Sequence, residues 1–312
     1  MRLRKAIRTT AWGLVAAGIA APLLRKRIPA PPVVSQAVAY GAPLALAIAA
    51  PRSRRRDVAI CALQMWAYLA AYKAPHDDED AQEARVHVDY PIAVDRLIGF
   101  GQLPSLRLQR ALARYEDGRP AWRLPDRVLV GAHWIWFTIP HATVLYVMVR
   151  RPEKFGRAAA LTYGVFNTGA IFYWLIPTAP PWYAAESRAE AAQVRRMMVE
   201  FGEDFWGEGW ESLYDAFGGN PLAAMPSLHF ATSLMAATLL AETGPVAGAV
   251  GYAYTATLGF ALVYLGEHYV TDLIAGAGLA LSIRRAAPVL GPAAEGFSRA
   301  VANVGEYARG PR

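Results

Sequence analysis

The sequence predicts an all-α fold: a polytopic membrane helical bundle with about six to eight transmembrane helices and additional amphipathic helices at the interface. Three observations support this prediction. Of the 312 residues, 54% are hydrophobic, and the mean hydropathy is positive, +0.19. The apolar residues are concentrated in long runs that contain few charges. The arginines cluster between these runs, which is typical of loops that fix the orientation of a membrane protein.

Apolar runs define the candidate spans. They cover residues 11–24, 33–50, 58–72, 128–149, 158–177, 227–241, 246–265 and 268–283. A full helical span needs ~20 residues, and the first and third runs are shorter than that. The opening "MRLRKAIR" followed by "AWGLVAAGIAAPLL" also resembles a signal peptide, although we expect it to remain as an uncleaved anchor.

Polar segments divide these runs into four regions. We expect N-terminal membrane helices over 1–72, a polar interfacial segment over 73–127, a membrane core over 128–285 and a cytoplasmic tail over 286–312. Within the core, residues 182–225 form a long outer loop rich in Trp, Tyr and Phe, which are common at the headgroup level. This loop is interpreted as an interfacial cap, and a lid over a lipid entry path is the alternative.

Charge and cysteine content exclude two classes of protein. The net charge of +7 could indicate a nucleic-acid partner, but membrane orientation explains arginines that lie between apolar runs, so no nucleic acid is expected. The single cysteine, Cys61, lies inside an apolar run. An intrachain disulfide or a Cys-based metal site is therefore excluded.

Basic loops predict the orientation of the core. Short loops rich in Lys and Arg stay in the cytoplasm, and "RRPEKFGR" at Arg150–Arg157 is the best example here. The spans that follow then place "PTAPPWY" (177–183), "PSLH" (226–229) and "GEHYVTD" (266–272) on the non-cytoplasmic side. "RSRRR" at Arg52–Arg56 agrees with this scheme, whereas "RKR" at 25–27 violates it and leaves open a shallow first hairpin.

Three polar stretches, far apart in sequence, thus meet at one face and suggest a reaction. His268 and Asp272 are four residues apart, so one helix face can carry both, with the carboxylate accepting the imidazole N–H. The other ring nitrogen of His268 is then available as a nucleophile. His229 can transfer a proton to a leaving oxygen, and Pro226 and Ser227 begin a helix whose N-terminus suits a phosphate. The residues therefore predict phosphoryl transfer from a lipid-borne phosphate through a phosphohistidine.

The same side chains could also serve other roles. The two histidines and the aspartate could ligate zinc, but there is no His-Glu-x-x-His signature and no Cys ligand, so neither a metal nor another cofactor is expected. His133 is expected near the outer end of its span, where it would line the site. Tyr183 and Tyr264, at the edges of their motifs, are further candidate substrate contacts. His141 lies deeper, and we expect it to be packed and hydrogen-bonded.

The motifs also resemble a known family. "MPSLHFA" and "GEHYVTDLIAG" are similar to the second and third signature motifs of the type 2 phosphatidic acid phosphatase superfamily. "PTAPPWY" resembles its inositolphosphotransferase-like branch, which includes inositol phosphorylceramide synthase. The resemblance covers roughly 128–283, with weaker likeness in "VDYPIAVDRLIGFGQLPSLRLQ". It implies a helical bundle and metal-independent catalysis, with His268 as nucleophile, Asp272 as its orienting acid, His229 as proton donor and Ser227 as a phosphate contact.

The chain departs from the superfamily pattern at two cations. The first motif, a Lys with a downstream Arg-Pro, is missing, and Leu262 stands where an Arg normally precedes the nucleophilic His by six residues. Both cations would hold the phosphate. Six arginines on the predicted outer side are candidates to replace them: Arg96, Arg107, Arg110, Arg188, Arg195 and Arg196.

The sequence therefore predicts an integral membrane phosphotransferase or phosphatase acting on a lipid phosphate or phosphodiester. Its partners would be the bilayer, a lipid phosphate substrate and, for a transferase, inositol or a lipid alcohol as acceptor. A lipid phosphatase that uses water is the nearest alternative. A non-enzymatic transporter or lipid-binding scaffold with the same fold is the second, supported mainly by the missing cations.

Overall fold

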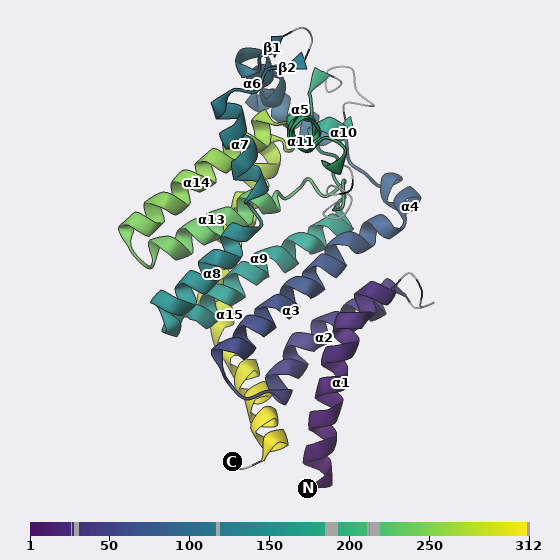
Figure 1. Cartoon of the computed structure of the whole chain (residues 1–312), viewed down its shortest axis with the longest axis vertical. Coiled ribbons are helices and arrows are strands. Elements are labelled where there is room, and N and C mark those ends of the chain that lie inside the picture. Colours follow the sequence, from purple (N-terminus) through teal and green to yellow (C-terminus); the bar gives the residue numbers. More distant parts are fainter. Residues whose placement is uncertain are drawn as a thin grey trace. The chain divides into compact units, whose positions relative to one another are not determined.

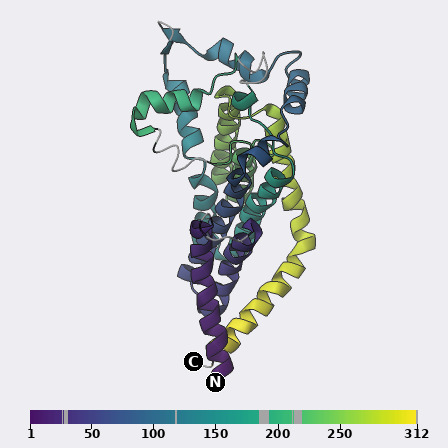
Figure 2. The ribbon, with the colours of Figure 1, turned by 90° about the vertical axis from the view of Figure 1, so that its right-hand side faces the viewer.

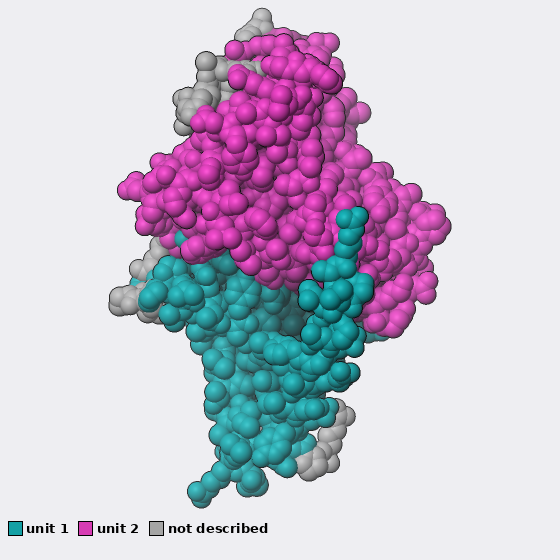
Figure 3. Space-filling view, turned by 180° about the vertical axis from the view of Figure 1, so that it is seen from behind, with its two compact units in different colours: residues 1–74, 285–312 teal, residues 75–284 magenta. Residues whose placement is uncertain are grey.

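The structure is a computed structural model that describes residues 1–25, 27, 31–116, 119–184, 193–210, 212 and 219–310. These residues are mostly helical (Figure 1). One small hairpin pairs β1 (Tyr115–Glu116) antiparallel with β2 (Arg119–Pro120). The all-α prediction is therefore confirmed. The chain divides into two compact units, residues 1–74 with 285–312 and residues 75–284 (Figure 3).

The first unit is built from α1 (Arg2–Leu24), α2 (Pro32–Ala49), α3 (Arg54–Lys73) and the later part of α15 (Val270–Arg309). Helices α1 and α2 approach closely, since a Cβ added at Gly18 would lie 2.5 Å from the Cβ of Ala42. The guanidinium of Arg309 donates to the carbonyls of Ile48 and Ala50 at 2.8 and 3.1 Å. The helix from the far end of the sequence is thereby bonded to the end of α2.

The second unit contains the predicted membrane core. Its long helices are α7 (Leu124–Trp134), α8 (Thr138–Arg150), α9 (Phe155–Leu175), α13 (Leu228–Ala241), α14 (Pro245–Tyr264) and the first part of α15. Helix α13 packs against α14, α8 and α9, and nine of its 14 residues are buried. A helix that is apolar all round and covered by its neighbours belongs in a core.

Where one span was expected over 128–149, the structure has two helices, α7 and α8, bent by 62°. Pro140 in the first turn of α8 accounts for the break. A proline ring in a helix clashes with the carbonyl four residues earlier, here that of Trp136, and it has no N–H to donate. The expected single helix is therefore interrupted at 135–137.

By length and composition, four helices among the described residues can cross a membrane, or five if α7 and α8 count as one span. The four are α1, α2, α14 and α15. Helices α3, α9 and α13 also form where spans were expected, but α13 has only 14 residues and the other two are not apolar enough for this test. The chain is a polytopic integral membrane protein with fewer strongly apolar helices than the six to eight expected.

Short helices cover one end of the second unit (Figures 1 and 2). They include η1 (Ala74–Asp77), α4 (Glu79–Glu83), α5 (Asp89–Ile98), α6 (Pro104–Leu112), α10 (Pro181–Ala184) and α11 (Met197–Trp206); a short turn, η2 (Pro152–Lys154), links α8 to α9. Phe201, Phe205 and Trp206 of α11 surround the ring of Trp134 with Trp210. These residues belong to the segment predicted to form an interfacial cap, and that role stays a prediction; residues 185–192, Tyr214 and Phe217 of the same segment lie outside the described part.

Helix α15 is longer than the sequence indicated. A span over 268–283 followed by a tail was expected, but the helix continues to Arg309. Pro288 lies inside it and leaves the carbonyl of Arg284 without its helical donor. The boundary between the two units falls at that residue.

Candidate active site

His229, His268 and Asp272 form one hydrogen-bonded chain. The Nδ1 of His229 lies 3.1 Å from the Nε2 of His268, and the Nδ1 of His268 lies 3.1 Å from the Oδ2 of Asp272. The side chains of His268 and Asp272 are 5% and 0% exposed. Two of these residues come from one loop and helix and the third from the start of α13, so the fold brings together the residues selected from the sequence.

The carboxylate of Asp272 determines which ring nitrogen of His268 carries the proton. An ionised Asp272 can only accept, so His268 carries its proton on Nδ1 and presents the lone pair of Nε2. With this tautomer of His268, the lone pair can accept an N–H from Nδ1 of His229, which lies 3.1 Å away. The arrangement gives His268 an oriented, uncharged nitrogen, which is the form that a nucleophile needs.

The start of α13 is held against α15. Ser227 is the N-cap, and its Oγ accepts the backbone N–H of Phe230 at 3.3 Å. Its own N–H donates to the carbonyl of Asp272 at 3.0 Å. A Cβ at Gly276 would lie 2.5 Å from the Ser227 carbonyl, so only glycine permits this approach. The hydroxyl of Tyr173 donates to the carbonyl of Pro226 at 2.9 Å. Ser227 and Pro226 therefore set the distance between the two histidines.

Two carboxylates satisfy the first backbone donors of α15. Asp272 Oδ2 accepts the N–H of Tyr269 at 3.0 Å. Asp95 of α5 accepts the N–H groups of Val270 and Thr271, each at 2.9 Å, and the Thr271 hydroxyl at 2.5 Å. Burial raises the pKa of Asp95, whereas the hydrogen bonds from Thr271 and Val270 oppose this rise. Asp95 thus caps the start of α15 from another helix, at the two residues that directly precede Asp272.

Aromatic rings fix the orientation of His229. The ring of His133, at the end of α7, stacks on it with centroids 5.1 Å apart and an interplanar angle of 24°. The indole of Trp136, in the break between α7 and α8, lies 4.0 Å away and donates to Thr232 Oγ1. Both ring nitrogens of His133 are buried and have no hydrogen-bond partner among the described residues. His133 therefore joins the group, as expected, with two polar atoms still unsatisfied.

The Pro-rich stretch is bonded to the strand-like segment ahead of Ser227. Thr178 lies between His87 and Ala223 in two parallel bridges. Its N–H donates to Leu222 and its carbonyl accepts from Ala224. The "PTAPPWY" motif therefore acts here as a scaffold beside "MPSLH".

Two expected substrate contacts point elsewhere. The hydroxyl of Tyr264 donates to Asp126 Oδ1 at 2.7 Å, and that of Tyr183 donates to Glu83 Oε1 at 2.9 Å. Tyr264 is buried, and its hydroxyl links α14 to α7. The structure places neither hydroxyl in the His229–His268–Asp272 chain.

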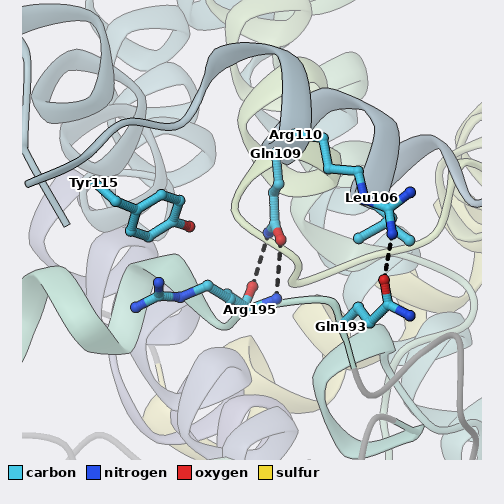
Figure 4. A pocket seen from close by; sticks show the side chains of 6 residues that line it. All are labelled: Leu106, Gln109, Arg110, Tyr115, Gln193 and Arg195. Carbon is cyan, nitrogen blue, oxygen red and sulfur yellow. Dashed lines mark hydrogen bonds between the residues drawn. The ribbon is translucent and has the colours of Figure 1, made fainter. Parts of the chain in front are cut away.

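A cavity of about 430 Å³ is lined in part by Arg195, whose carbonyl lies close to Gly266 in the turn that precedes His268. Figure 4 shows the side chains that line this cavity. Its lining residues are Leu106, Gln109, Arg110, Tyr115, Gln193 and Arg195. The amide of Gln109 donates to the carbonyls of Arg195 and Tyr264 at 2.8 and 2.9 Å and accepts the N–H of Arg195. None of the six lining residues belongs to the His229–His268–Asp272 group, and the Gln109 amide links Arg195 to Tyr264 beside the cavity.

Sequence reasoning missed Asp95, Trp136 and Gln109. One signal pointed to Asp95: it occupies an inward position on the helix whose other inward residues, Pro91 and Ile92, are apolar. A buried carboxylate there needs donors from outside its helix. Nothing local in the sequence identifies those donors, since Val270 is 175 residues away.

Within the described residues, no group of three or more His, Cys, Asp and Glu side chains is arranged as a metal site. The His133 and His229 rings are stacked face to face rather than pointing at a shared centre.

Comparisons with known proteins match this part of the chain. Residues 132–285 match the PAP2 superfamily. Inositol phosphorylceramide synthase of Candida albicans is 28% identical over 159 residues, 48% of this chain and 33% of that protein. The inositol phosphorylceramide synthase catalytic subunit of Schizosaccharomyces pombe is 29% identical over 132 residues, 39% of this chain and 30% of that protein. The matches thus span about a third of each relative, and no solved structure matches. They confirm the resemblance predicted from the motifs.

Proposed function

Because the chain carries a PAP2 superfamily domain and resembles the inositolphosphotransferase-like branch, we propose that it is an integral membrane lipid phosphotransferase or phosphatase. The observation that carries the proposal is the hydrogen-bonded His229–His268–Asp272 group, in which His268 and Asp272 are buried. It supplies a nucleophile, an orienting carboxylate and a proton donor in contact with one another.

The first half-reaction forms a covalent intermediate. The hydrogen bond between the two imidazoles opens, and the Nε2 of His268 attacks the phosphorus of a lipid phosphate or phosphodiester. A P–N bond forms, and the P–O bond to the leaving group breaks. His229, in its protonated form, gives its proton to the leaving oxygen and becomes neutral. Asp272 accepts from Nδ1 and stabilises the positive charge that develops on the His268 ring.

The second half-reaction transfers the phosphoryl group to an acceptor. Neutral His229 takes the proton from the attacking hydroxyl, whose oxygen displaces His268 Nε2. An alcohol as acceptor gives a headgroup transferase, and water gives a lipid phosphatase. The printed names of the two relatives favour transfer, with inositol or a lipid alcohol among the partners. Neither half-reaction draws on a metal ion.

We also place the site on the non-cytoplasmic face. The basic end of α9 and Arg284 meet at Glu242, at the far end of α13 from the histidines. A chain without Cys61 that carries Cys at the exposed position 100 or 151 tests this orientation. A membrane-impermeant thiol reagent should label position 100 in intact cells and position 151 only after the membrane is opened; the reverse order would place the site inside.

The test of function compares His268→Ala with the unchanged protein, purified in detergent with EDTA present. Lipid phosphates and phospholipids, with and without inositol, are supplied as substrates. We expect turnover by the unchanged protein and a loss of at least about 10³-fold in the variant. His141→Ala is the matched control, because it removes an imidazole from the same unit that stacks on Phe166 and is not part of the His229–His268–Asp272 group. Free phosphate would indicate the phosphatase and a new inositol lipid the transferase, whereas equal behaviour of the variant and the unchanged protein would refute the nucleophile.

A further inference from the structure

The structure narrows the choice of cation for the substrate phosphate. Of the six arginines expected on the outer side, Arg188 lies outside the described residues. Arg96 is exposed on α5, and Arg107 donates to the carbonyl of Gly99. Arg110 bonds to Gln193, and Arg195 pairs with Glu200 and lies over the ring of Tyr115. The guanidinium groups of Arg107, Arg110 and Arg195 are thus engaged by partners outside the His229–His268–Asp272 group.

Arg196 is placed differently. Its Nε donates to Oε1 of Glu267, the residue before His268, at 3.2 Å. Its guanidinium also lies over the ring of Trp182, 3.6 Å from the centroid, so the Pro-rich motif orients the charged plane. One side chain thus contacts two of the three motif stretches that build the site.

The backbone around Arg196 is bonded to the turn that leads into His268. The N–H of Met197 donates to the carbonyl of Leu265 at 3.0 Å, and Gln109 links Arg195 to Tyr264. Gly266 has a φ of +80°, and a Cβ on it would lie 2.4 Å from the Arg195 carbonyl. The position of Arg196 relative to this turn is therefore fixed by main-chain contacts.

The same turn explains why the usual position cannot supply the cation. Leu262 is fully buried, and its carbonyl accepts the N–H groups of both Glu267 and His268 at 3.0 Å. A side chain there points into the apolar interior of the unit. A charge that serves the site must come from a segment that covers the turn from the other side, as Arg196 does.

We propose that Arg196 binds the substrate phosphate, and that Glu267 is the counter-ion that the phosphate displaces. A guanidinium presents its N–H groups as a planar fork that fits two oxygens of a phosphate or phosphodiester. Glu267 is a carboxylate competing for that fork, and its side chain is 10% exposed. The inference rests on the proposed function, and it assigns Arg196 and Glu267 opposite effects on phosphate binding.

The effects of Arg196 and Glu267 substitutions on phosphate affinity distinguish phosphate binding from a purely structural ion pair. If Arg196 and Glu267 only hold the turn together, removing either partner should weaken the site alike. If Glu267 competes with phosphate, Glu267→Gln should tighten binding while Arg196→Gln weakens it. Arg196→Lys keeps the charge but loses the fork, so an intermediate affinity is expected.

The experiment measures the thermal midpoint of the full-length protein in detergent as inorganic phosphate is titrated. Phosphate should stabilise the unchanged protein in a saturable way. We expect the apparent affinity to fall at least about 10-fold in Arg196→Gln and to rise in Glu267→Gln. The matched control is Arg195→Gln, the adjacent arginine paired to Glu200, which should stay within about twofold of the unchanged protein.

Three results would overturn the proposal: unaltered phosphate affinity in Arg196→Gln, equal weakening by Arg196→Gln and Glu267→Gln, or an unchanged protein indifferent to phosphate. Binding is read without lipid turnover, so the two proposals fail separately. Phosphate binding that depends on Arg196 with no turnover of any lipid would leave this inference standing and reject the enzyme. Turnover that depends on His268 but not on Arg196 would support the proposed enzyme and reject the role of Arg196.

Discussion

The two ends of α13 carry polar groups of the same kinds in different surroundings. At its start, His229 bonds to His268 and His268 to Asp272, and the side chains of His268 and Asp272 are 5% and 0% exposed. Just beyond its last residue, Glu242 pairs with Arg157 of α9 and Arg284 of α15 at 2.8 and 2.7 Å. The side chains of this second group are 45%, 21% and 31% exposed for Arg157, Glu242 and Arg284.

Burial and unsatisfied atoms distinguish the two groups. At the Glu242 end, the carboxylate pairs with two arginines that are partly exposed to solvent, and such pairs contribute about 0.2–1 kcal/mol each. At the other end, Asp272 Oδ1 and both nitrogens of His133 are buried without a hydrogen-bond partner in the described part of the chain. Unpaired buried polar atoms are costly and tend to occur where function requires them. The difference agrees with the proposal that the histidine end binds the substrate and that the Glu242 end stabilises the packing of the helices.

The largest difference between the two ends should come from matched carboxylate-to-amide changes. Asp272→Asn removes the acceptor that fixes the His268 proton on Nδ1, so the nucleophile takes the wrong tautomer or turns away. We expect kcat to fall by about 10³–10⁴-fold with a smaller change in KM, measured on the lipid that the unchanged protein consumes.

Glu242→Gln is the control for that change, because it is the same chemical substitution at the other end of the helix. It should leave kcat within about twofold. Equal losses in the two variants would mean that Asp272 acts by stabilising the fold, and the orienting role would have to be abandoned.

A smaller effect is expected at Asp95, which positions the turn rather than touching the reacting atoms. In Asp95→Asn, one oxygen can still accept from Thr271, but the amide would face the N–H of Val270 and leave that donor unpaired. We expect kcat to fall about 10–100-fold with little change in KM, together with a lower thermal midpoint.

The control is Asp89→Asn, the same change at an exposed position on the same helix. Its stability should stay within about 0.5 kcal/mol of the unchanged protein. A loss of stability in Asp95→Asn with kcat preserved would show that the cap serves the fold alone. A rise in KM with kcat unchanged would instead assign Asp95 to substrate binding.

The sequence predicted features that depend on local spacing, and it did not predict contacts between distant segments. Apolar runs predicted the helices. The spacing of His268 and Asp272, with "PSLH" at a helix start, predicted which side chains meet in the candidate site, because those relations are local or repeat with the helix period. Asp95, Trp136 and Arg196 act through contacts between segments tens to more than a hundred residues apart, and no periodicity encodes such pairs. Tyr264 shows the converse: a tyrosine at a motif edge was expected to face substrate, but Asp126 provided a nearer buried partner.

The smallest effect concerns stability at the Glu242 end as the pH changes. Burial would raise the pKa of Glu242, but the hydrogen bonds and charges of Arg157 and Arg284 outweigh it and hold the pKa below its ordinary value. A carboxyl group whose pKa is lowered by folding stabilises the folded state above its unfolded pKa, and that contribution is lost as the pH falls through the folded pKa. Thermal midpoints of the unchanged protein and Glu242→Gln should therefore differ by a small amount near pH 7, and the difference should shrink in acid and at high salt. If the difference between the two thermal midpoints grew in acid, Arg157 and Arg284 would not be stabilising the ionised carboxylate of Glu242.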